Sequence, residues 1–140
     1  MPQLVLKLDS TIRAGRILHA VLLLAALLNI FMAEVFSHHE PHDVHVIWVG
    51  FLVNGLLLAG IALYFRIWML ATAAEILRTK PEDQFALARW RFGNILSFVL
   101  AESIVLFGFA LRFIGGTSLQ CLPFYITGIA LMILWFPRRP

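Results

Sequence analysis

The chain has 140 residues, of which 61% are hydrophobic and 14% are charged, and its formal net charge is +3. A core of this size cannot hide so much apolar surface from water, so we expect an integral membrane protein in contact with a lipid bilayer. The basic residues lie at the edges of apolar runs, a pattern of membrane topology that argues against nucleic-acid binding, and the single cysteine, Cys121, excludes a disulfide within the chain.

Four apolar runs follow one another along the chain, and we predict that each is a transmembrane helix. They cover about residues 16–36, 46–70, 92–113 and 119–136, close to the roughly 20 residues that cross ~30 Å of hydrocarbon. The fourth run is the shortest, because Pro123 near its start and Pro137 near its end limit extension. Residues 1–15 form a cytoplasmic N-terminal segment, expected as an interfacial turn or as disorder. The predicted fold is an all-α membrane four-helix bundle over residues 16–140.

Lysine and arginine are distributed unevenly among the connecting segments. They precede the first run, separate the second run from the third and follow the fourth, at Lys7, Arg13, Arg16, Arg78, Lys80, Arg89, Arg91, Arg138 and Arg139. The other two connections, residues 37–45 and 114–118, contain none, and Arg112 is the only basic residue near that side. Because cytoplasmic loops carry an excess of these residues, we predict that both termini are cytoplasmic. We expect the membrane to be a bacterial inner (plasma) membrane.

The connection after the first run, residues 37–45, is rich in imidazole and carboxylate groups. Its four histidines are candidate metal ligands: His38, His39, His42 and His45. Imidazole and carboxylate together suit zinc, copper or nickel, so a divalent metal is the one cofactor that the sequence indicates. The spacing matches no closed structural site, and a pH-sensitive solvated loop and a plain connector stay open as alternatives.

Glu102 lies near the midpoint of the third run, where a charged side chain is costly. Asn29 in the first run and Asn54 in the second lie slightly to the outer side of their midpoints, so all three could share one membrane layer. We interpret Glu102, Asn54 and Asn29 as a candidate proton- or ion-binding set. The alternative is a protonated Glu102 that only holds two helices together by a hydrogen bond. Glu34 lies farther out and is expected to extend to the interface.

Small residues recur at a spacing of four in the third run, at Gly93, Ser97 and Ala101, with Gly108 close to the same stripe. The second run offers Gly55 and Ala59. Small residues at this spacing let two helix backbones approach closely, so we predict a tight contact between the second and third helices.

The loop from Arg78 to Glu82 and the helical stretch from Ala101 to Gly108 carry a resemblance to a known family. With them, residues 46–113 resemble the hairpin of the c subunit (proteolipid) of rotary ATP synthases. The resemblance implies that Glu102 is the ion-carrying carboxylate, and that Arg78, Pro81 and Glu82 belong to the loop that meets the rotor shaft. The second run lacks the family's regular glycines, the loop is longer, and two further spans flank the hairpin. We therefore interpret the segment as a distant c-like protein or a convergent hairpin.

The short loops leave little room for a catalytic domain, and the sequence holds no nucleophile–base pair or Gly-rich phosphate loop, so we predict that the protein is not an enzyme. We predict a small membrane protein that is a subunit or assembly factor of a larger membrane complex. Its expected partners are lipid, other membrane subunits or further copies of itself. The alternative is a proton-, cation- or metal-handling membrane protein that uses Glu102 or the histidine-rich loop.

Overall fold

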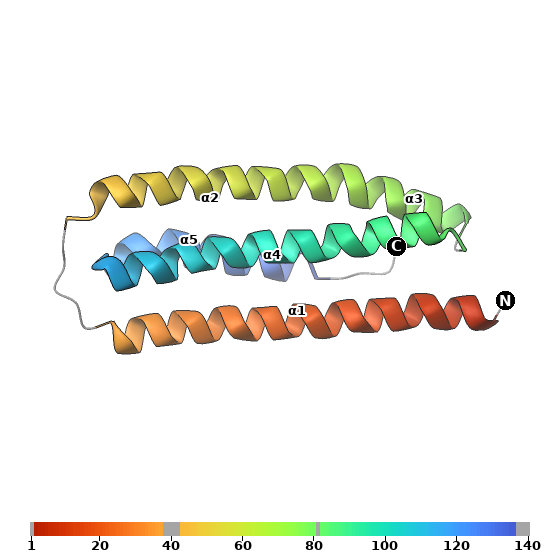
Figure 1. Ribbon diagram of the computed structural model, residues 1–140, viewed down its shortest axis with the longest axis horizontal. Coiled ribbons are helices and arrows are strands. Elements are labelled where there is room, and N and C mark those ends of the chain that lie inside the picture. Colours follow the sequence, from red (N-terminus) through yellow and green to blue (C-terminus); the bar gives the residue numbers. More distant parts are fainter. Residues whose placement is uncertain (1, 38–42, 81, 137–140) are drawn as a thin grey trace.

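The structure, a computed structural model, is entirely helical over the residues that it describes, which are 2–37, 43–80 and 82–136. Its elements are α1 (Pro2–Phe36), α2 (His45–Phe65), the π-helical segment η1 (Arg66–Leu70), α3 (Ala71–Thr79), α4 (Gln84–Ile114) and α5 (Ser118–Leu134). Because α2, η1 and α3 follow one another without a break, they form one rod beside α1, α4 and α5 (Figure 1). The prediction of an all-α fold is confirmed.

Three of these rods are long and apolar enough to cross a membrane. They are Ser10–Phe36 within α1, His45–Thr79 over α2 to α3, and Gln84–Ile114, which is α4. The helix α5 is apolar too, but its 17 residues are fewer than a typical crossing needs. The chain is therefore a multi-pass membrane protein with three long candidate spans, and the fourth predicted span is shorter than the others.

The helices extend beyond the predicted spans at one end of the bundle. The chain is helical from Pro2, so the expected turn or disorder before residue 16 is wrong for the described residues. The second rod continues past residue 70 to Thr79, and α4 already begins at Gln84, where Asp83 caps it by accepting from the amides of Phe85 and Ala86. Charges end an apolar run but not a helix, because alanine, leucine, glutamate and arginine all favour helical backbone.

This extended end carries most of the described lysine and arginine residues. We name it the basic end and define it by six residues from α1, α3, α4 and the α3–α4 connection: Arg13, Arg16, Arg78, Lys80, Arg89 and Arg91. The opposite end holds the α4–α5 turn.

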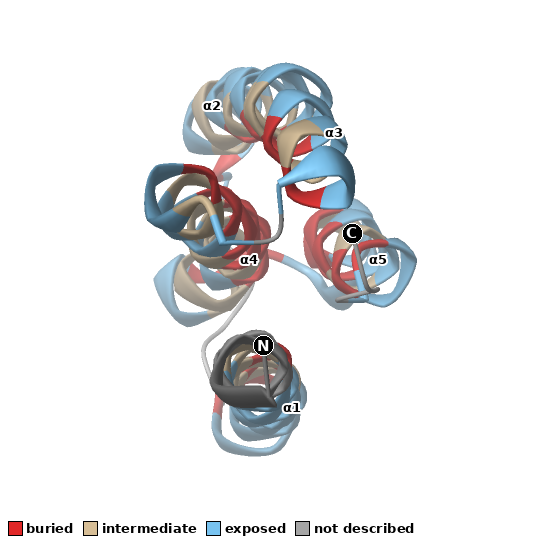
Figure 2. Cartoon of the chain, turned by 90° about the vertical axis from the view of Figure 1, so that its right-hand side faces the viewer, coloured by how far each residue is buried: buried red, intermediate tan, exposed pale blue. Residues whose placement is uncertain are grey.

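The central element of the bundle is α4, which packs against every other helix (Figure 2). The share of residues that are buried in the protein, counted over the apolar stretch of each candidate span, is 44% for α4, 17% for α1 and 11% for the α2–α3 rod. Helices α1 and α2 lie on opposite sides of α4, and their described residues do not contact each other. Both helices therefore turn a broad apolar face away from the bundle.

A single narrow seam attaches α1 to the rest of the fold. Its buried residues Ile12, His19, Ala26 and Ala33 recur every seventh position, which is the repeat that keeps one face of a helix towards its neighbour. The seam meets α4 and α5.

The closest approach between helices is made by α4 and α5. A Cβ atom on Gly128 would overlap Val105 Cγ2 and lie 2.9 Å from the carbonyl oxygen of Ala101, and one on Gly108 would lie 2.5 Å from Tyr125. The small residues of α4 therefore mainly allow close packing against α5. The predicted tight contact between the second and third helices is limited to Gly93 against Leu70, because Gly55 has only ordinary contacts at 3.6 Å or more.

We expect Gly128→Ala to destabilise the bundle by about 1–3 kcal/mol, because its methyl group would overlap α4. Gly60→Ala makes the same chemical change where a Cβ meets nothing within 4 Å, so it should not lower stability. Unfolding of both variants by sodium dodecyl sulfate, followed by circular dichroism in micelles, measures the difference. Equal unfolding midpoints would contradict the close α4–α5 contact.

Candidate functional site

Glu102 is half-buried on the side of α4 that turns towards α1. It continues the row Arg91, Ile95 and Phe98, whose spacing of four, three and four residues keeps them on one side of the helix and which line a groove against α1. Among the described residues, the Glu102 carboxylate makes no hydrogen bond or ion pair. The structure thus gives this mid-span carboxyl an apolar setting without a polar partner from the described chain.

The structure turns Asn54 away from the bundle and gives the three candidate ion-binding residues, Glu102, Asn29 and Asn54, no hydrogen bond to one another. Asn29 is half-buried in α1, one turn from Ala26 and Ala33 of the seam. Asn54 is exposed on the outer side of α2, and its Nδ2 donates to the carbonyl oxygen of Gly50 in the same helix at 2.8 Å. The described side chains of the three residues make no hydrogen bond with one another. A shared ion site therefore stays a prediction.

The predicted metal site in the histidine-rich loop falls mostly outside the described residues, which do not include His38, His39 and His42. His45 is exposed at the start of α2, where its ring stacks on Trp48 at 6.1 Å and its amide donates to Asp43 Oδ1 at 3.1 Å. Within residues 2–37, 43–80 and 82–136, no group of three or more His, Cys, Asp or Glu residues could hold a metal ion. Metal binding by this loop stays a prediction.

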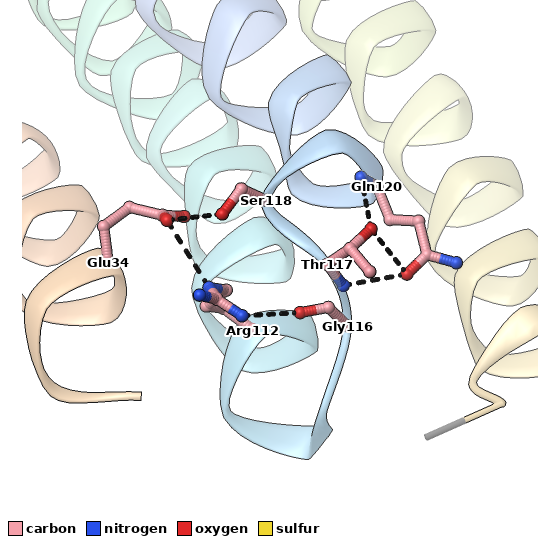
Figure 3. Close-up of polar contacts among 6 residues, drawn as sticks. All are labelled: Glu34, Arg112, Gly116, Thr117, Ser118 and Gln120. Carbon is pink, nitrogen blue, oxygen red and sulfur yellow. Dashed lines mark hydrogen bonds and ion pairs between the residues drawn. The ribbon is translucent and has the colours of Figure 1, made fainter. Parts of the chain in front are cut away.

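A polar cluster that the sequence did not reveal joins α1, α4 and α5 at the end opposite the basic end (Figure 3). Glu34 Oε2 accepts a hydrogen bond from Ser118 Oγ at 2.6 Å and lies 3.5 Å from Arg112 Nε. Arg112 Nη1 donates to the carbonyl oxygen of Gly116 at 3.0 Å. We name Glu34, Arg112 and Ser118 the clasp, because one residue from each of three helices meets there.

The turn between α4 and α5 positions two members of the clasp. Gly115 ends α4 with φ 109°, a left-handed conformation that glycine adopts without strain. Thr117 then caps α5 through two reciprocal hydrogen bonds with Gln120. The backbone amide of Gln120 donates to Thr117 Oγ1 at 3.3 Å, and the backbone amide of Thr117 donates to Gln120 Oε1 at 2.9 Å. This short turn fixes Arg112 and Ser118 on the side where α1 brings Glu34.

Sequence reasoning missed the clasp because Glu34 was expected to extend to the interface. The available signal was a pair of opposite charges, Glu34 and Arg112, each near the same end of its helix. The side chains of Glu34 and Arg112 are 35% and 20% exposed, respectively. The buried Arg112 Nε makes no hydrogen bond, so its ion pair with Glu34 supplies its counter-charge. The arrangement links α1, α4 and α5 through side-chain contacts.

The fold defines a multi-pass helical membrane protein with three long apolar helices. No protein-family model, curated protein or solved structure matches the chain. The resemblance to the rotary c subunit therefore depends on the sequence motifs alone. Of its loop residues, Arg78 and Glu82 are exposed, and Pro81 lies outside the described residues.

We expect the clasp to stabilise the bundle through coupling between Glu34 and Arg112. Glu34→Gln and Arg112→Gln should each lower stability, and the double variant should lose less than the sum, with a coupling energy of about 1 kcal/mol. Unfolding by sodium dodecyl sulfate measures all three, and Arg78→Gln, at an exposed arginine of α3, is the control for loss of one positive charge. Strictly additive losses would show that the ion pair contributes nothing.

Proposed function

We propose that the chain crosses the membrane four times, with the basic end in the cytoplasm and α5 as a short fourth span. The clustering of arginine and lysine at one end supports this orientation. Helix α5 runs back along α4 and packs against it, and its 17 residues rise roughly 26 Å, somewhat less than the hydrocarbon thickness. Trp135 and Phe136 continue the apolar sequence at its end.

We propose further that the protein is a subunit or assembly factor of a larger membrane complex, and that it associates through the outer face of α2. A row of six residues follows this face with alternating spacings of three and four: Ile47, Gly50, Asn54, Leu57, Ile61 and Tyr64. All are exposed except Gly50, which is half-exposed. This spacing is the one through which two helices interlock along a seam.

The exposed amide of Asn54 is the main observation that supports this proposal. Its amide sits on the apolar face of a membrane-spanning rod, and its own helix supplies one acceptor, the carbonyl oxygen of Gly50. Within the described residues, the Asn54 side chain has no further partner. Lipid tails offer none, so a second helix that hydrogen-bonds the amide is favoured, with a typical gain of ~1 kcal/mol. A Cβ on Gly50 would meet nothing within 4 Å, which leaves room for that helix one turn away.

Association of the chain with its partner helix should therefore weaken when the Asn54 amide is replaced by an apolar side chain of similar volume. We expect native mass spectrometry of the protein, extracted from its own membranes in mild detergent, to show an assembly larger than one chain. Asn54→Leu should shift it towards the single chain. Thr127→Val removes a polar group from the exposed side of α5 and should leave the assembly unchanged. A single chain in the wild type, or an unchanged assembly with Asn54→Leu, would overturn the proposal.

A second candidate function is proton or cation handling by Glu102. It is favoured by one observation, the absence of any described partner for this carboxylate, while Arg112 of the same helix is engaged by Glu34. An acid in apolar surroundings without a counter-charge is held more easily in its neutral form, which can take up and release a proton.

We expect a hydrophobic carbodiimide, which reacts with protonated carboxyls in apolar surroundings, to label Glu102 in the folded protein. Glu102→Gln should abolish labelling and keep the fold, because glutamine can make the hydrogen bonds of the neutral acid. Glu75→Gln, at an exposed position of α3, should leave labelling unchanged. Labelling and circular dichroism are the two measurements. An unlabelled wild-type Glu102 would remove the proton-handling candidate.

A further inference from the structure

A groove runs between α1 and α4 at the basic end of the bundle. It consists of a wide outer section of about 540 Å³ and a narrower inner section of about 170 Å³. Thr11, Arg91 and Ile95 line both sections, so the two are continuous. The groove is separate from the α2 face and from the clasp.

The chemistry of the groove changes along its length. Ser10, Thr11 and Gln84 line the outer section, nearest the starts of α1 and α4. Leu18 and Phe98 line the inner section, which reaches farther towards the middle of the membrane. Arg91 stands between the two, directly before the apolar run of α4 that begins at Phe92. The groove thus passes from hydroxyl and amide groups, through one cation, to hydrocarbon.

Arg91 brings a positive charge to this groove, and the described residues do not neutralise it. Three other arginines of the described chain are engaged: Arg112 faces Glu34, Arg16 lies over the Phe136 ring at 5.6 Å, and Arg89 lies over the Trp68 ring at 5.2 Å. Arg91 makes no hydrogen bond, ion pair or ring contact with the described residues, and none of the described residues that line the two sections is an aspartate or glutamate. The described walls of the groove are therefore complementary to an anion.

We propose that this groove binds a phospholipid with an anionic headgroup. The Arg91 guanidinium binds the headgroup phosphate, since its planar fork can donate two hydrogen bonds to phosphate oxygens. Ser10, Thr11 and Gln84 surround the polar part of the headgroup, and the first carbons of an acyl chain enter the inner section beside Phe98. A free phosphate would use the cation but not the apolar inner section, so the order of polar and apolar walls selects a lipid.

The test is native mass spectrometry of the full chain in detergent with equal amounts of phosphatidylglycerol and phosphatidylcholine. We expect the wild type to retain phosphatidylglycerol, and Arg91→Gln to reduce retention by about tenfold, the loss expected for one charge-assisted hydrogen bond. Arg78→Gln removes the same charge from an exposed position of α3 that does not line the groove. It should retain the lipid as the wild type does.

A second variant tests the groove without changing its charge. Gly15 lines the inner section and a Cβ there would meet nothing within 4 Å, so Gly15→Leu should fill this space and also reduce retention. Inorganic phosphate in excess should fail to displace the lipid. Equal losses with Arg78→Gln and Arg91→Gln would show attraction by surface charge alone. That result, unchanged retention in Gly15→Leu, or displacement by inorganic phosphate would each overturn the proposal.

Discussion

The rest of the fold depends on the contact between α4 and α5 at Gly108 and Gly128. Within lipid, helices gain little from leaving an apolar solvent, so they associate mainly through close van der Waals packing. Two glycines without side chains let these backbones approach until α4 touches Tyr125 and α5 touches Val105. Helices α1 and α2 then attach on either side of this pair, and each keeps its outer face for lipid or for a partner.

Many polar side chains bond to their own helix, whereas the hydrogen bonds and the ion pair between helices that the structure describes lie at the end opposite the basic end. Asn94 and Ser97 of α4 each donate to the carbonyl oxygen four residues earlier, a bond that holds no neighbour. At the end opposite the basic end, the Glu34–Arg112 pair ties α1 to α4, and Trp48 Nε1 donates to the carbonyl oxygen of Gln120 at 2.9 Å, which ties α2 to α5. The specific polar links are thus concentrated where the chain makes its turns.

The sequence predicted where the helices lie along the chain, but it predicted poorly which side chains of different helices contact each other. An apolar run reports directly how much chain fits in hydrocarbon, so the long spans were recognised, but the helical ends were not, because residues 71–79 and 84–91 are charged yet helical. Depth along a helix can be read from a sequence, and rotation about its axis cannot without knowing what packs against it. The outward orientation of Asn54 was therefore not predicted, and Glu34 and Arg112 were not recognised as partners.

The separation of α1 from α2 has a consequence for how the protein is made. The consecutive helices α1 and α2 do not form a packing unit, since their described residues do not contact each other. Their common neighbour α4, and the α4–α5 hairpin that it begins, follow them in the sequence and are synthesised after them. Until then, α1 and α2 lie in the bilayer without the helix that holds them in the folded bundle. During that interval, chaperones, proteases and other nascent helices can reach the seam of α1, the outer face of α2 and the side of α2 that later contacts α4.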